Sequence, residues 1–345
     1  ISLTRAVEGS PQLFVLDNIT KEGLISTDIN LKFDLDGEIK NNYQITGTVK
    51  KAKFNIFNKV EIDDLNLSFN ISNNQLTLKK IETNLNSIKL KSPLIKIEKK
   101  KDIFFVDGEV ANKEQNFDIN KLKPIFGDLL NNIEIEKIDF NSINIFSFNV
   151  NRKLKLKDLK LETNLNLENF QIVKNPLNLK TFLPNYAEQI KFKDHKIKIK
   201  LIKGILDIRG DGDIYIGDES EQLSYSVIKD DRKITFDTNL NIKNNPLTIN
   251  FLDYKKKKGN SSEILLKGIY KKNKELILKD ISITEKNNQI LIKDLLFSKN
   301  FKIKDLSYIK LNYRNKNDLL NNLELKKNKS NFSINGKSFD ATQLI

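Results

Sequence analysis

Apolar and polar residues alternate with a period of two along most of the chain, a pattern typical of strands that bury one face. Clear examples are 29–35 (INLKFDL), 197–210 (IKIKLIKGILDIRG) and 234–242 (ITFDTNLNI). Polar breaks such as SNN at 72–74 and KKNK at 271–274 separate these segments. The pattern therefore predicts antiparallel strands joined by polar hairpins, in a nearly all-β chain with a few short helices.

A second pattern interrupts this alternation. In LKLKDLKL (154–161) the apolar residues resume one position out of step after the Asp. Such a strand keeps both halves on one core only if an extra residue forms a β-bulge; otherwise the position is a corner between two strands. Asp suits both, because its carboxylate accepts bonds from backbone N–H groups left unpaired there, whereas an ordinary solvent-exposed Asp on a regular strand is the alternative. The unit recurs and predicts five structural bulge or corner residues: Asp64, Asp158, Asp280, Asp294 and Asp305. Looser copies with Lys in place of Asp are LTLKKIET (76–83) and IEIEKIDF (133–140).

Only three stretches have a helix-like spacing of apolar residues: 119–131, 175–191 and 317–325. The phrase F-D-x-x-x-L occurs at Phe117 and again at Phe339, and it suggests a repeat in which a strand delivers an Asp N-cap to a short helix. We therefore expect one continuous chain over 1–345 with a soft repeat boundary near 131, giving units 1–131 and 132–345.

One-sided alternation requires something to cover the apolar face, since burying each Leu, Ile or Phe side chain contributes about 1.5–3 kcal/mol. The few helical stretches are not enough. The sheet must either fold on itself as a sandwich or barrel, or curl into a trough that holds another apolar partner. Repeated bulges bend and twist strands, so they favour an elongated, curled antiparallel sheet that forms an open apolar groove.

Composition limits the function classes. Lys+Arg 59 against Asp+Glu 45 gives a net charge of +14, but the lysines are scattered among acids and asparagines, which favours a solvated surface over a nucleic-acid interface. The absence of Cys excludes disulfides, thiolate nucleophiles and zinc–thiolate sites. No apolar run is longer than that at 103–106, which is too short to span a membrane. Because the chain does not begin with Met, we expect an N-terminal anchor or signal to precede it.

The candidate chemical sites have structural explanations. His195 is the only histidine, and no partner at triad or metal-ligand spacing accompanies it, so we interpret it as a solvated residue near a strand end. Asp207, Asp211 and Asp213 lack the spacing of a calcium loop, and the Gly210 region does not open a helix as a phosphate loop does. We therefore expect no enzyme activity, no cofactor and no metal site.

Several phrases resemble the AsmA-like superfamily of bacterial envelope proteins, in particular its YhdP and TamB branches. They are the apolar-x-apolar-x-Asp-Leu-x-Leu units, the strand phrase at 28–54 and the closing INGKSFDATQLI at 334–345. Members of this family resemble one another in being long β-grooves, anchored at the inner membrane and crossing the periplasm, that are implicated in phospholipid passage to the outer membrane. The resemblance implies a periplasmic location, an inner-membrane anchor, and partner proteins in the periplasm or outer membrane.

On this basis we expect a structural lipid-transfer conduit that carries phospholipid acyl chains along the apolar groove between the two membranes, with no nucleic acid involved. The residues expected to line the groove are Ile62, Leu65, Leu67, Leu154, Leu156, Leu159, Leu161, Ile281 and Ile283. The alternative is a non-enzymatic periplasmic or extracellular β-sandwich that acts in binding or adhesion.

Overall fold

The computed structural model describes the 345-residue chain except for 1–19, 38–42, 57–59, 73–74, 118–119, 121–133, 152, 154, 175–178, 187–188, 273 and 343–345. The protein is all-β: one large antiparallel sheet of 19 strands, which does not close on itself, and one two-stranded sheet. The chain divides into two compact units. The first comprises Ile1–Asn132 and Asp139–Asn164, and the second comprises Ile133–Ile138 and Leu165–Ile345.

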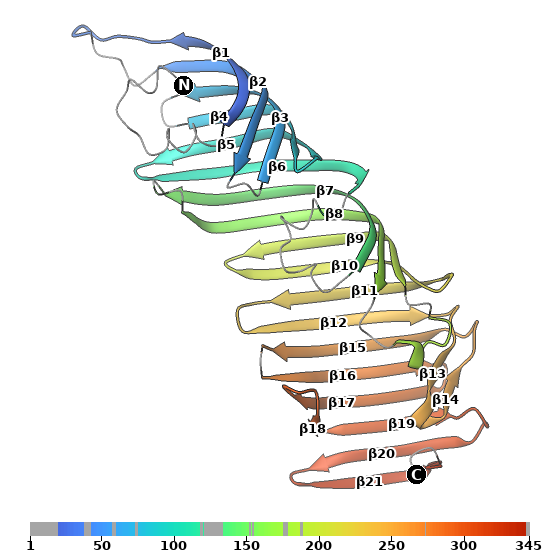
Figure 1. The fold of residues 1–345 in the computed structure, drawn as a ribbon. Coiled ribbons are helices and arrows are strands. Elements are labelled where there is room, and N and C mark those ends of the chain that lie inside the picture. Colours follow the sequence, from blue (N-terminus) through green and yellow to red (C-terminus); the bar gives the residue numbers. More distant parts are fainter. Residues whose placement is uncertain are drawn as a thin grey trace. The chain divides into compact units, whose positions relative to one another are not determined.

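The first unit contains six complete strands, each paired with the next along the chain (Figure 1). They are β1 (Thr20–Asn30), β2 (Gln44–Ile56), β3 (Val60–Ser72), β4 (Gln75–Leu85), β5 (Ile88–Lys100) and β6 (Ile103–Asn116). The division between the units passes through the two longest strands, β7 (Glu134–Asn151) and β8 (Leu156–Lys174).

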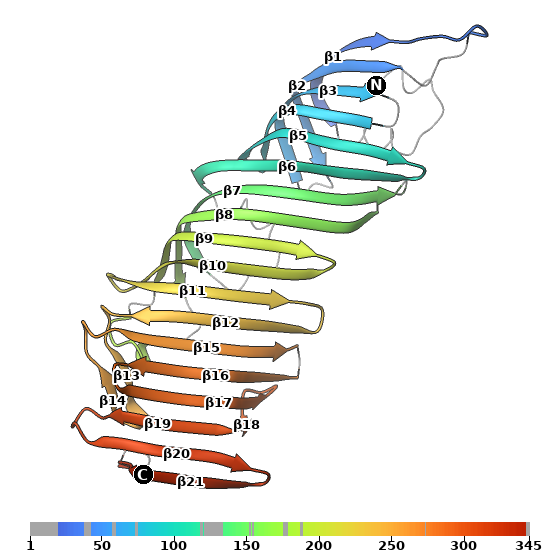
Figure 2. The ribbon, with the colours of Figure 1, turned by 180° about the vertical axis from the view of Figure 1, so that it is seen from behind.

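The second unit continues with strands that also follow chain order (Figure 2). They are β9 (Ile190–Ile202), β10 (Ile205–Ile216), β11 (Glu219–Lys229), β12 (Lys233–Ile242), β15 (Ser262–Lys271), β16 (Glu275–Glu285), β17 (Asn288–Ser298), β18 (Ile303–Asp305), β19 (Tyr308–Arg314), β20 (Leu320–Asn328) and β21 (Asn331–Ser338). Between β12 and β15 the chain forms the separate hairpin of β13 (Leu247–Ile249) and β14 (Tyr254–Lys256), with the 3-10 helix η4 (Asn250–Leu252) at its turn.

The positions where the sequence pattern slips have an unusual backbone. Asp64, Asp158 and Asp294 all have positive φ angles, between 51° and 54°, in the left-handed region. Pairing of β3 with β2 and with β4 shifts by one residue at Asp64, which is therefore the extra residue of a β-bulge. Lys80, the Lys of a looser copy, has a φ of 54° and a register shift of its own.

The remaining two aspartates differ in detail. Asp280 has no left-handed φ, and the extra residue of β16 relative to β15 is its neighbour Lys279. Asp305 is the last residue of β18, and its Oδ1 accepts the backbone N–H of Leu306 at 2.9 Å. The other aspartates bind mainly side chains, as when Asp158 Oδ2 accepts a bond from Asn149 Nδ2 at 2.8 Å. Asp is tolerated at these positions chiefly because its short side chain accepts the left-handed backbone.

The bulge keeps both halves of a slip motif on one face. On β15, which has no slip, Ile264, Leu266, Gly268 and Tyr270 are alternate residues and share a face. They lie opposite Ile283, Ile281, Leu278 and Leu276 of β16, respectively. The leucine half and the isoleucine half of LILKDISI therefore point to the same side of the sheet.

Of the three predicted helices, two are wrong and one lies almost entirely outside the described residues. Of 175–191, the structure describes 179–186 and 189–191. This part holds only the three-residue 3-10 helix η3 (Leu179–Thr181) before β9 begins. The helix prediction is wrong there, because these apolar side chains are spaced to pack onto the sheet. Within 317–325, residues from 320 onward belong to β20, so that prediction is also wrong. The predicted helix at 119–131 lies outside the described residues apart from Asn120.

Candidate functional site on the apolar sheet face

The second unit has one strongly apolar sheet face, which we call the apolar face. Cross-strand rows define it, for example Ile208 of β10, Val227 of β11 and Phe236 of β12, which lie directly opposite one another. A second row joins Leu266, Ile281 and Ile292 across β15, β16 and β17. Each side chain in these two rows is only partly buried. The face therefore keeps apolar surface available beyond what neighbouring strands cover.

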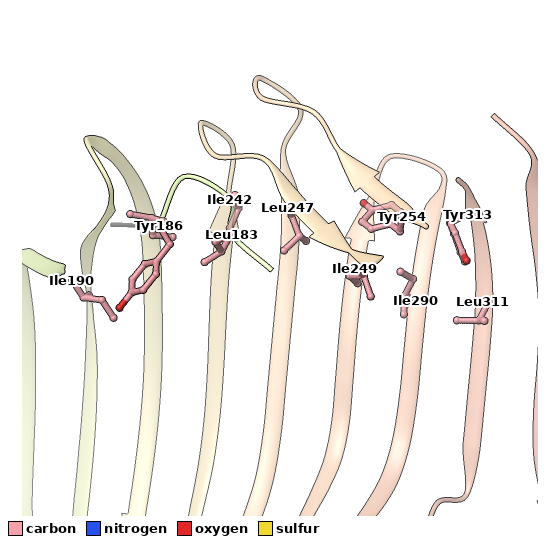
Figure 3. Close-up of a cluster of buried hydrophobic side chains, with 11 residues drawn as sticks. Leu183, Tyr186, Ile190, Ile242, Leu247, Ile249, Tyr254, Ile290, Leu311 and Tyr313 are labelled. Atoms are coloured by element: carbon pink, nitrogen blue, oxygen red, sulfur yellow. The ribbon is translucent and has the colours of Figure 1, made fainter. Parts of the chain in front are cut away.

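One end of the apolar face is covered by a second layer, which we call the cap and define as residues 179–186 and 243–261. Figure 3 shows Leu183 and Tyr186 from the first segment and Leu247, Ile249 and Tyr254 from the second, gathered over the ends of the sheet strands. Beneath them lie six buried sheet residues: Ile190, Ile216, Ile242, Ile290, Leu311 and Tyr313. These residues form a buried hydrophobic core at one end of the face.

Buried polar groups fasten the cap to the sheet. The carboxylate of Glu221, only 3% exposed, accepts the backbone N–H groups of Lys243, Asn244 and Asn245 at 2.6–2.8 Å. Fully buried Lys256 donates to the carbonyl oxygen of Asn245 at 2.6 Å, and burial lowers the pKa of this amine. These hydrogen bonds satisfy backbone N–H and C=O groups of the cap, which apolar side chains cannot do.

A second buried carboxylate, that of Glu285, also accepts hydrogen bonds from the cap. Glu285 accepts the hydroxyl of Tyr254 at 2.7 Å and the side-chain amide of Asn260 at 2.7 Å. Burial, followed by the Glu285 carboxylate, raises the pKa of Tyr254, so the phenol stays protonated and donates this bond. The Tyr313 hydroxyl donates to the Leu252 carbonyl at 2.6 Å. The cap is thus held by side chains from β11, β16 and β19.

Away from the cap, glycines on the apolar face let aromatic rings of the neighbouring strand lie flat against the sheet. Gly210 lies opposite Tyr225, and Gly268 lies opposite Phe236. A Cβ at either glycine would meet the facing ring at 2.6 Å and 2.4 Å, respectively, so each ring lies across the bare backbone of its partner. Gly47 and Phe69 form the same arrangement in the first unit. The aromatic surface is therefore spread flat along the sheet and does not project from it.

Eight of the nine predicted groove-lining residues lie in three described strands. Ile62, Leu65 and Leu67 of β3, Leu159 and Leu161 of β8, and Ile281 and Ile283 of β16 are all partly buried, and Leu156 is 49% exposed. Leu154 lies outside the described residues. In β16 the two residues have different surroundings, since Ile283 packs against the capped core whereas Ile281 is not part of that cluster. The lining set thus includes both capped and uncapped positions.

His195 was misjudged from the sequence. It is 1% exposed, not solvated, and its Nε2 lies 2.9 Å from the Asp213 carbonyl oxygen, while Nδ1 is buried without a partner in the described structure. The phrase IKFKDHKI (190–197) is a further copy of the slip motif, with His in an apolar position after Asp194, whose φ is 52°. Searching for the motif with one polar substitution allowed would have found it.

No protein-family model, curated protein or solved structure matches this chain. The described residues contain no group of three His, Cys, Asp or Glu side chains placed to hold a metal ion. Within the same residues, no helix has the length and hydropathy needed to cross a membrane. Function therefore has to be argued from the apolar face itself.

Proposed function

We propose that the apolar face binds phospholipid acyl chains, and that the chain is a structural conduit of the AsmA-like kind, with its strands curled into an open groove. The observation that carries the proposal is the uncapped part of the face. Rows of Ile, Val, Leu and Phe continue beyond the cap with part of each side chain exposed. Exposed apolar surface of this extent usually marks a binding site for an apolar partner.

The flat aromatic rings support an elongated ligand in particular. Glycines opposite Tyr225 and Phe236 keep these rings against the sheet, so the face is smooth along the direction that crosses the strands. An alkyl chain lies across such a surface and gains dispersion contacts along its length, and each buried methylene contributes about 0.8 kcal/mol. In the proposed conduit, phospholipid acyl chains pass along this surface in a bacterial periplasm, between an anchor at the inner membrane and partners at the outer membrane.

The sandwich alternative expects two sheets packed face to face around closed cores. The described strands form one 19-stranded sheet that is not closed, with only the β13–β14 hairpin apart from it. This arrangement does not fit the sandwich alternative.

The first unit offers a test by photocross-linking. Phe69, Leu78 and Ile95 lie opposite one another across β3, β4 and β5, and Leu67 shares their face. A photoreactive residue at Ile95 should capture phospholipid when the protein is expressed in a bacterial envelope. Leu67→Glu should reduce that capture several-fold while the fold persists, because a charge on an open face can reach water. The matched control is Ser68→Glu, which adds the same charge to the opposite face.

Two results would count against the proposal. Unchanged lipid capture in a folded Leu67→Glu protein would mean that this face is not the route. Global unfolding of Leu67→Glu, with Ser68→Glu still folded, would mean that the position lies in a closed core of the kind that a sandwich has.

A further inference from the structure

The second unit carries a strongly basic edge. It is formed by the hairpin turns that connect β9 to β10, β11 to β12, β15 to β16, β17 to β18 and β20 to β21, and we call it the basic edge. These turns all lie at the end of the sheet opposite the cap, since antiparallel strands alternate in direction. The exposed cations at these turns are Lys203, Lys229, Arg232, Lys233, Lys272, Lys274, Lys299, Lys302 and Lys329.

A cavity of about 640 Å³ lies at this edge and combines two kinds of surface. Its floor includes Leu206, Ile234 and Tyr270, which belong to the apolar face. Its rim includes Lys229, Arg232, Lys233 and Lys272 from two successive hairpins. A second cavity of about 400 Å³ shares Tyr270 and adds Lys274 and Lys299. The apolar face therefore ends in cationic cavities at the end away from the cap.

Two acids, Asp230 and the exposed Asp231, also line this cavity, so its four cations are reduced to a net charge of +2 and are not cancelled. Asp230 Oδ1 accepts the backbone N–H groups of Arg232 and Lys233 at 2.8 and 2.9 Å, bonds that shape the turn and lower the pKa of its carboxyl group. Glu275 is paired with Lys271 at 2.6 Å, outside the rim. Within the described part of the chain, no ion pair engages any of the four rim cations.

We propose that the 640 Å³ cavity binds the anionic phosphate head of an amphiphile, with the phosphate at the Lys and Arg rim and the alkyl chain over the Leu206, Ile234 and Tyr270 floor. This inference rests on the proposed function and adds the position and chemistry of the head group. An inorganic anion would use only the rim, and an uncharged alkyl chain would use only the floor. Four cations beside an apolar floor fit a ligand that has both parts, bound by charge-assisted hydrogen bonds at the head and by burial of the alkyl chain.

Head groups would then lie at the basic edge and not at the opposite edge. The cap already covers the apolar face there, and its buried carboxylates Glu221 and Glu285 are committed to the cap's own bonds. Exposed lysines at that end, such as Lys255 and Lys257, belong to the cap, beneath which the apolar core is already covered. The two edges of one sheet thus give an amphiphile a defined orientation across the strands.

Single-chain amphiphiles below their micellar concentration test this with the full chain. The chain has no Trp, so Tyr270→Trp places a single fluorophore in the cavity floor, and titration calorimetry on the unsubstituted protein checks that the reporter does not alter binding. The probes are dodecyl phosphate, dodecyl maltoside and inorganic phosphate. We expect dodecyl phosphate to bind about tenfold more tightly than dodecyl maltoside, and inorganic phosphate to bind more weakly than either.

The decisive variant is Lys229→Gln/Arg232→Gln/Lys233→Gln, which should remove the preference for dodecyl phosphate and leave dodecyl maltoside affinity unchanged. Its control is Lys255→Gln/Lys257→Gln/Lys286→Gln, which removes the same charge from exposed positions at the capped end and should keep the preference. Equal binding of both amphiphiles by the unsubstituted protein would overturn the head-group site while leaving the apolar face as a binder. Failure of both amphiphiles to bind would overturn the proposed function. Inorganic phosphate that binds as tightly as dodecyl phosphate would reduce the cavity to an anion site.

Discussion

Burial of His195 predicts a specific dependence of stability on pH. The imidazole is 1% exposed, and loss of hydration is the main cause that lowers its pKa below the ordinary 6.5; the carbonyl of Asp213 and the carboxylates of Asp211, Asp213 and Asp194 oppose this. The Tyr225 ring also faces it, but burial raises the pKa of that phenol to about 12, so it is neutral throughout the range considered. The folded protein therefore resists protonation of His195 more than the unfolded chain does.

The sign follows from proton linkage. Below pH 6.5 the unfolded chain binds a proton at His195 that the folded protein does not, so the free energy of unfolding falls as pH falls, down to the folded pKa. One proton can contribute a slope of at most about 1.4 kcal/mol per pH unit. Since this is the only histidine and carboxylates titrate mainly near pH 4, the window from pH 7.5 to 5.5 isolates one group.

Urea unfolding at pH 7.5, 6.5 and 5.5 measures the slope, and His195→Leu is the comparison because other copies of the motif carry Leu or Ile at this position. The native protein should lose stability over the range, whereas the variant should change little. Nuclear magnetic resonance of the single imidazole Cε1 proton gives the folded pKa directly. A folded pKa at or above 6.5, or equal slopes in both proteins, would refute the reasoning.

Three further predictions concern the sheet and the cap. Glu221→Ala should lower the free energy of unfolding by about 3 kcal/mol in urea titration, because three backbone N–H groups lose their acceptor, while exposed Glu324→Ala should change it little. Gly268→Val should cost at least about 2 kcal/mol in the same assay, since its Cβ would overlap the Phe236 ring; Thr235→Val, on the other face, is the control. Asp294→Val should lower the melting temperature more than Asp294→Gly, because a left-handed φ costs an L-residue about 1–2 kcal/mol.

Strand content could be predicted from alternation because each strand buries one face, and the period of two survives in the sequence wherever that holds. The slip at residues 154–161 could be recognised for the same reason, since a left-handed residue shifts the alternation by one position. The failures at 175–191 and 317–325 have a common cause. Apolar residues at helix-like spacing arise there from chain segments that cross the sheet or enter a strand, and their spacing is set by the sheet beneath them.

The basic cavity was not visible in the sequence. Lys229, Arg232, Lys233 and Lys272 looked like scattered surface charge. The first and the last are 43 positions apart along the chain, in a region of mixed charge. Pairing of β11, β12 and β15 places their turns at one end of the sheet, next to Tyr270. Register decides which turns become neighbours, and composition contains no information on register.

Pairing in chain order also has a consequence for how such a protein can change its length. In the registers that the described residues define, a strand bonds to the next strand of the sheet along the chain, with two exceptions to simple succession. The 243–261 excursion separates β12 from β15, and β17 pairs both with the short β18 and with β19. Stability then resembles a sum of nearest-neighbour terms, as in repeat proteins. Duplicating one hairpin would extend the sheet by about 10 Å without disturbing any existing pair. Evolution could therefore adjust the span of this protein in hairpin-sized steps.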